Sequence, residues 1–60
     1  MKIKKFNVVE LNNGNRATIL EVLGNRYLAE IVNCYGITLD KKIITENEIR
    51  KVIYNKEKIK

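Results

Sequence analysis

Short runs of hydrophobic and β-branched residues, separated by turn-forming residues, make up the first half of the chain. The runs cover residues 6–11, 16–23 and 26–32, and their composition is typical of strands. The first two are separated by Asn12-Asn13-Gly14-Asn15, and the next two by Gly24-Asn25 alone. Two residues of this type between two β-rich runs are typical of a tight hairpin. The pattern therefore predicts three consecutive antiparallel strands.

A third turn and a fourth strand follow. Asn33-Cys34-Tyr35-Gly36 has the composition of a turn, with Gly36 suited to a left-handed backbone conformation. The run that begins at Ile37 predicts a strand that extends to about residue 43.

The sharpest local signal in the chain predicts a single helical turn before the last strand. Thr45 and Glu48 have the spacing of a capping box, and Ile44 and Ile49 fit the hydrophobic staple that accompanies it. The β-branched run 52–54 follows so closely that only one turn of helix has room to form.

The two-residue loop also predicts a register for the second and third strands. With Gly24-Asn25 as the loop, the numbers of opposed residues sum to 49. One face then appears as the core face: Thr18 opposite Ile31, Leu20 opposite Ala29, and Val22 opposite Tyr27. The other face mixes apolar and charged residues: Ala17 opposite Val32, Ile19 opposite Glu30, Glu21 opposite Leu28, and Leu23 opposite Arg26.

Five short strands in 60 residues are too few for a large sandwich. A strongly bent sheet buries one face and removes open edges, and its first and last strands lie side by side. We therefore predict an all-β fold, a small five-stranded SH3-like barrel with one short helical turn before the last strand. The expected domain covers residues 1–60, with an ordered core of about 5–54 and a basic tail of 55–60.

Several segments together resemble a family of short bacterial SH3-like barrel proteins catalogued as a domain of unknown function. The segments are Phe6-x-Val8-Val9, Thr18-Ile19-Leu20-Glu21-Val22, Tyr27-x-Ala29-Glu30-Ile31-Val32, Gly36-x-Thr38 and Ile44-Thr45-x-x-Glu48-Ile49. The chain departs from the family at Ala17, where a glycine is usual, and at Asn33-Cys34-Tyr35, where acidic turn residues are usual. The resemblance implies the barrel fold and an accessory protein of a mobile or toxin-associated locus, but no assigned activity.

The net charge of +5 lies at the two ends of the chain. Residues 1–5 carry +3 from three lysines, and residues 50–60 carry +4 from five basic residues less Glu57. Residues 6–49 sum to −2, from four basic and six acidic residues. Small barrels that bind nucleic acid use basic surfaces with stacking aromatics. The candidate contacts for this alternative function are Lys2, Lys4, Lys5, Arg50, Lys51, Tyr54, Lys56 and Lys58.

The sequence contains few residues of the types that enzymes use for catalysis. The chain has no histidine, no serine and one cysteine, so neither a Ser-His nor a Cys-His pair can be built within it. Cys34 is expected to be an ordinary turn residue, and one thiol cannot build a zinc site. Glu21 and Glu30 share a face of the hairpin, but surface glutamates of this kind usually serve solubility. We expect no enzyme activity, no catalytic residue, no metal and no cofactor.

The sequence also indicates the cellular compartment of the protein. No segment has the ~20 apolar residues of a membrane span, and the apolar run after the basic start is too short for a signal peptide. A lone thiol fits a reducing compartment. The expected location is the cytoplasm, without membrane contact.

The mixed face of the hairpin makes protein binding the leading functional hypothesis. Two interpretations of this face are open. Either the bend of a small barrel buries part of both faces, or the apolar residues of the mixed face, surrounded by a charged rim, contact a partner. Tyr35, at the tip of a turn, is a further anchor candidate, and an exposed first or fourth strand could also accept an edge from a partner. The partner is another protein or a second copy, as for an antitoxin-like, immunity-like or phage-encoded inhibitor protein. The candidate interface residues are Ile19, Glu21, Leu23, Arg26, Leu28, Glu30 and Tyr35.

Overall fold

A computed structural model describes residues 3–54, which form one five-stranded antiparallel sheet with the strand order β4-β3-β2-β1-β5. The elements are β1 (Val8–Leu11), β2 (Arg16–Leu23), β3 (Arg26–Val32), β4 (Thr38–Thr45), a 3-10 turn η1 (Glu46–Glu48) and β5 (Ile49–Tyr54). The predicted all-β class and the helical turn before the last strand are confirmed. β2 and β3 have the predicted ends, whereas β1 is shorter and β4 longer than the sequence indicated.

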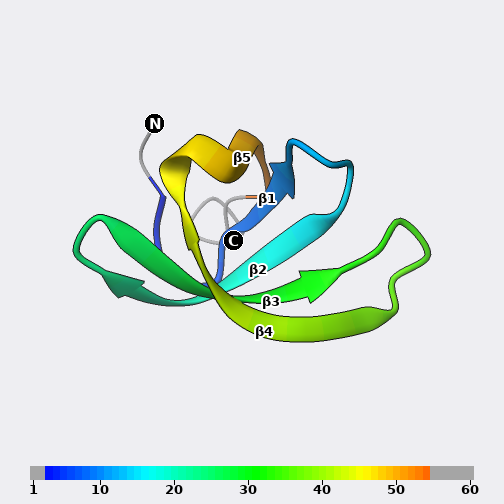
Figure 1. Cartoon of the computed structure of the whole chain (residues 1–60), viewed down its shortest axis with the longest axis horizontal. Coiled ribbons are helices and arrows are strands. Elements are labelled where there is room, and N and C mark those ends of the chain that lie inside the picture. Colours follow the sequence, from blue (N-terminus) through cyan, green and yellow to red (C-terminus); the bar gives the residue numbers. More distant parts are fainter. Residues whose placement is uncertain (1–2, 55–60) are drawn as a thin grey trace, which may run out of the picture.

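The sheet is strongly bent. Figure 1 shows β4 running up into η1, with β5 and β1 lying across the hollow side of the sheet. β1 pairs with β5, so the first and last strands are neighbours as predicted. β4 and β5 are the two edge strands and are not paired with each other, so the sheet is open.

The β2–β3 hairpin has the predicted two-residue loop. Leu23 lies opposite Arg26, and Gly24 has φ +75°, while Asn25 has an ordinary negative φ. A positive φ at the first loop position alone is the type II′ turn, which matches the twist of the flanking strands.

Further along the hairpin the predicted register is wrong. It holds from the loop as far as Glu21 opposite Leu28, but a bulge at Leu20 then shifts the pairing by one residue, so that Ile19 lies opposite Ala29. Because a one-residue shift moves side chains to the other face, Ala17 and Ile19 enter the core in place of Thr18 and Leu20. Val22 lies opposite Tyr27 as predicted, yet it is 41% exposed and outside the core.

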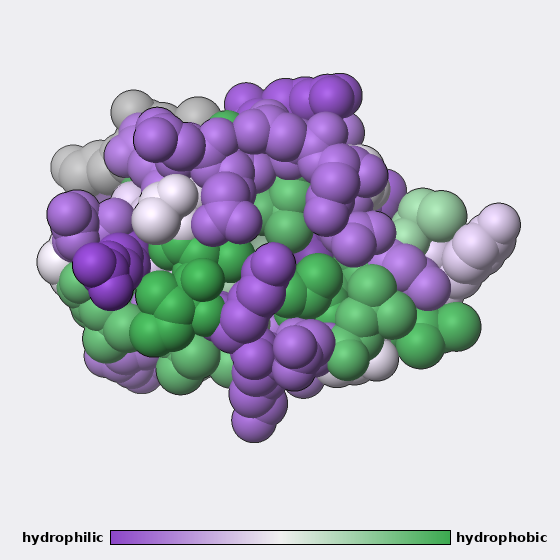
Figure 2. Space-filling model, in the orientation of Figure 1, coloured by the Kyte–Doolittle hydropathy of each residue, from purple (hydrophilic) through white to green (hydrophobic). Residues whose placement is uncertain are grey.

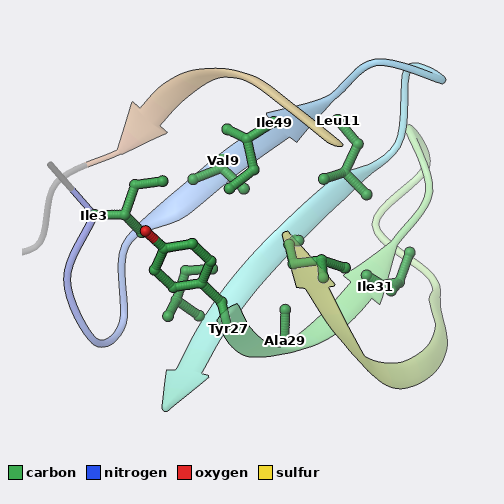
Figure 3. Packing of buried hydrophobic residues seen from close by; sticks show 10 residues of the cluster. Ile3, Val9, Leu11, Tyr27, Ala29, Ile31 and Ile49 are labelled. Atoms are coloured by element: carbon green, nitrogen blue, oxygen red, sulfur yellow. The ribbon is translucent and has the colours of Figure 1, made fainter. Parts of the chain in front are cut away.

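The core lies on the hollow side of the sheet and draws on every strand. Figure 3 shows labelled side chains from β1, β3 and β5 gathered on this side, together with Ile3 from the segment before β1. The predicted core residues Tyr27, Ala29 and Ile31 are confirmed. The buried apolar residues are Ile3, Val9, Leu11, Ala17, Ile19, Tyr27, Ala29, Ile31, Ile44 and Ile49.

The turn η1 is fixed at both ends. The backbone N–H of Thr45 donates to Oε1 of Glu48 at 3.0 Å, in the predicted capping box, and the staple residues Ile44 and Ile49 are both buried. Asn12, in the β1–β2 turn, anchors η1 from the other side. Its backbone N–H donates to the Glu48 carbonyl (3.0 Å), and its side-chain amide donates to the Asn47 carbonyl (2.8 Å).

The segment before β1 has an unusual backbone. The N–H of Asn7 donates to the Lys4 carbonyl at 3.1 Å, and Phe6 within this turn has φ +73°. Phe6 and Asn7 continue the ladder to β2, since Phe6 N–H donates to the Ile19 carbonyl and Ile19 N–H donates to the Asn7 carbonyl. The Asn7 side chain is fully buried, and neither its oxygen nor its nitrogen has a hydrogen-bond partner among residues 3–54.

Candidate protein interface

The second face of β2, β3 and β4, on the side away from the core, is called here the outer face. Its residues follow from the register, because strand neighbours of the buried Tyr27, Ala29 and Ile31 must point the other way. β3 contributes Arg26, Leu28, Glu30 and Val32, and the paired positions on β2 and β4 supply the rest. The predicted mixed face is therefore real, but the bulge changes its membership.

Three apolar residues on adjoining strands form a cluster at the end of the outer face beside the β2–β3 loop. Leu28 on β3 lies directly opposite Ile43 on β4, and Leu23 lies near the end of β2 at the same end of the sheet. Ile43 is 50% and Leu23 44% exposed, and Leu28 is half-buried between its neighbours. We call Leu23, Leu28 and Ile43 the Leu28 patch.

Charged residues surround the Leu28 patch. Glu21 lies opposite Leu28 on β2, and Arg26 lies opposite Leu23. Glu30 lies one position further along the same face, opposite Lys41 of β4. Figure 2 shows a comparable mixture, with green hydrophobic surface in the lower part of the view broken by purple hydrophilic side chains. An apolar centre with a charged rim is the usual anatomy of a protein interface.

Ile19 does not belong to this surface, contrary to the sequence analysis. Its side chain is fully buried, because the bulge at Leu20 turns it into the core opposite Ala29. A partner cannot contact it without unfolding the hairpin.

Tyr35 lies at the tip of the β3–β4 turn and is 84% exposed. The turn is held by Asn33, whose Oδ1 accepts hydrogen bonds from the N–H groups of Tyr35 (2.9 Å) and Ile37 (3.0 Å). Ile37 (59% exposed) and Leu39 (53%) continue the apolar surface from the turn into β4. The predicted interface did not include these two residues, because the sequence pattern does not show which apolar side chains of a strand remain exposed.

The basic residues proposed for nucleic-acid binding are partly paired with acids. Glu10 on β1 lies 3.4 Å from Arg50 Nη1 and 3.8 Å from Lys51 Nζ, and Glu21 lies 3.7 Å from Lys5 Nζ. Lys5 also lies over the Phe6 ring, 5.3 Å from its centroid. Lys4 precedes β1, and Tyr54 ends β5 opposite Val8. Lys2, Lys56 and Lys58 lie outside the described residues.

A surface hollow of about 170 Å³ lies between the β1–β2 turn and η1. The side-chain amide of Asn12 is already bonded to Asn47 at its rim. Amides, one ammonium and one carboxylate make up its polar groups, and they form no nucleophile–base pair. It is lined by Leu11, Asn12, Asn13, Lys42, Asn47 and Glu48.

Other candidate chemistry is dispersed in the part of the chain that the structure describes. Cys34 is exposed in the β3–β4 turn. Glu21 and Glu30 lie opposite Leu28 and Thr18, not opposite each other. Within residues 3–54, no three acidic or thiol side chains gather as metal ligands would, and no helix has the length or apolar character to cross a membrane.

Comparison of the chain with protein-family models, with curated proteins and with solved structures found no match.

Proposed function

We propose that this chain is a non-catalytic protein-interaction module that binds its partner through the Leu28 patch of the outer face. The observation that carries the proposal is the Leu28 patch, which exposes Leu23 and Ile43 beside Leu28 on three adjoining strands. The acids and the arginine around it supply a polar rim, and interfaces concentrate binding energy in such an apolar centre.

The proposed architecture is an SH3-like barrel. It is supported by the strand order, in which β1 lies between β2 and β5, and by the single helical turn before the last strand. The edges of β4 and β5 would then form the open seam of the barrel.

For its biological class, we propose an antitoxin-like, immunity-like or phage-encoded inhibitor protein of the cytoplasm. The resemblance described above supports this class. The exposed thiol of Cys34 is in keeping with a reducing compartment.

Nucleic-acid binding is the weaker candidate. Arg50, Lys51 and Lys5 each lie within 4 Å of a carboxylate, which lowers the positive potential of the surface they occupy. We therefore expect labelled single- and double-stranded nucleic acid to show no saturable binding at low salt. Binding that weakens steeply as salt rises would favour this function instead.

The direct test of protein binding compares two glutamate variants on the same strand. Leu28→Glu places a charge in the centre of the Leu28 patch. Val32→Glu places the same charge on the same strand and face, also at a half-buried position, but opposite Arg16 and Thr38. In affinity capture from the native host, with the bound protein identified by mass, Leu28→Glu should lose the partner that the wild type and Val32→Glu retain.

Circular dichroism supplies the control for folding. If Leu28→Glu unfolds while Val32→Glu remains folded, Leu28 belongs to the core and the outer face is not the interface. Equal capture by all three folded proteins would also contradict the proposal.

A further inference from the structure

β4 offers an unpaired edge along most of its length. Among the described residues, it pairs with β3 on one side and with no strand on the other. Leu39 is 53% and Ile43 50% exposed along it. A long edge strand with exposed apolar residues is a template for pairing with another strand.

The backbone groups that face this edge can be identified. The N–H of Lys41 donates to Oδ1 of its neighbour Asp40 at 2.7 Å, and the N–H of Thr45 donates to Oε1 of Glu48. Both amides therefore donate to a nearby side chain of the same protein, Asp40 of β4 in one case and Glu48 of η1 in the other. Since backbone groups point alternately to either side of an antiparallel strand, those of Ile43, midway between the two, face the edge as well.

The charges along β4 are self-complementary in one register. When two copies pair antiparallel about a two-fold axis, opposed residues must belong to the same face, so the axis passes through a single residue. With Lys41 at the axis, Asp40 lies opposite Lys42 of the second copy and Lys42 opposite Asp40. A register centred on any of these three residues places like charges at the axis, but only the Lys41-centred register also sets two pairs of Asp40 and Lys42 opposite each other.

The Lys41-centred register also suits the remaining side chains. It brings Leu39, at the bulge between β3 and β4, opposite Ile43 of the second copy, and this apolar pair occurs twice. The two Lys41 side chains meet at the axis, but each also lies opposite Glu30 of its own β3. In the dimer, the second β4 strand supplies an acceptor for the Lys41 N–H. The Asp40 carboxylate is then released from that N–H and can pair with the ammonium of Lys42 in the second copy.

We infer that the chain forms a symmetric dimer in which two β4 strands pair antiparallel, with Lys41 at the two-fold axis. The two sheets become one continuous sheet. The inference rests on the proposed function as an interaction module and names a second copy of the chain as a partner.

A charge exchange tests the register. Asp40→Lys gives lysine at both positions 40 and 42, and Lys42→Asp gives aspartate at both, so each variant repels itself. In an equimolar mixture, however, the two lysines of one variant face the two aspartates of the other. The doubly exchanged chain, with Asp40→Lys and Lys42→Asp together, is again complementary to itself.

In sedimentation equilibrium, the wild type and the double variant should reach twice the 7.0 kDa mass of one chain as concentration rises. Each single variant should self-associate at least tenfold more weakly, and the mixture should recover the dimer. Circular dichroism would show whether each single variant is folded. Monomers at every concentration for the wild type, or a dimer unaffected by either exchange, would overturn the inference.

Failure of the dimer is distinguishable from failure of the proposed function. If the charges on β4 only protect the edge from aggregation, the wild type is monomeric, yet capture of another protein still depends on Leu28. If capture is independent of Leu28, the proposed function fails whatever the sedimentation result.

Discussion

Ile19 lies directly opposite Ala29 across the β2–β3 ladder, and both side chains are fully buried. Two residues further along β2, Glu21 lies opposite Leu28 on the outer face. Leu20 is the extra residue between these two pairs, and it is half-buried. This bulge decides which residues of β2 form the core and which are left on the outer face for a partner.

The bulge predicts unequal effects for two neighbouring truncations. Ile19→Ala removes a fully buried side chain and should cost about 2–5 kcal/mol. The core of a domain of this size rarely supplies more than about 3–5 kcal/mol, so this variant should lose most of its stability. Leu20→Ala should cost no more than about 1 kcal/mol, because part of the side chain is already in water. Urea denaturation followed by circular dichroism measures both free energies of unfolding. If Leu20→Ala were the more destabilising of the two, the register without a bulge would be correct.

The buried amide of Asn7 predicts a stabilising substitution. Its oxygen and nitrogen have no hydrogen-bond partner within the part of the chain that the structure describes, and a buried unsatisfied polar group costs about 1–3 kcal/mol. Asn7→Val replaces the amide with an apolar side chain of similar size and should raise the free energy of unfolding by about 1–2 kcal/mol. A fall in the melting temperature would show instead that the amide is hydrogen-bonded in solution.

The positive φ of Phe6 predicts that glycine is preferred to alanine at this position. Both Phe6→Gly and Phe6→Ala remove the half-exposed ring and its contact with Lys5, so their comparison isolates the backbone. At φ +73°, a residue with a Cβ is strained by about 1–2 kcal/mol relative to glycine. The glycine variant should therefore unfold at the higher urea concentration. Greater stability of the alanine variant, the usual order in extended backbone, would contradict the strained turn.

Turn residues explain why so much of the strand layout could be predicted. Gly24 at the first loop position and the capping box of Thr45 and Glu48 act locally, so the loop and η1 could be read from a few neighbouring residues. The adjacency of β1 and β5 followed from the need to bury one face of a short sheet.

The bulge could not be predicted from alternation, because Ile19 and Leu20 are both apolar and either could point inward. The doublet Ile19-Leu20 departs from strict alternation, but Ile43-Ile44 is a doublet of the same kind in a stretch without a bulge, so a doublet does not locate one. The contacts of Glu10 with Arg50 and Lys51 were also beyond prediction, because 40 residues separate Glu10 from Arg50. Those contacts weaken the basic surface that the net charge suggested.

The capping box predicts a local effect on exchange. Glu48→Ala removes the acceptor of the Thr45 N–H and should cost about 0.5–2 kcal/mol, whereas Glu48→Gln keeps an acceptor oxygen and should cost less. Amide hydrogen exchange at Thr45 is the measurement: faster in the alanine variant, close to wild type in the glutamine variant. Equal exchange in all three proteins would mean that the bond is absent in solution.

The most direct measurement of the central claim is an amide exchange footprint of the chain with and without its captured partner. Protection on binding should centre on Leu28 and extend to Leu23 and Ile43, because the Leu28 patch is the proposed contact surface. The basic end of the sheet, at Lys5, Arg50 and Lys51, should exchange as in the free chain. Protection centred on that basic end, with Leu28 unchanged, would contradict binding through the outer face.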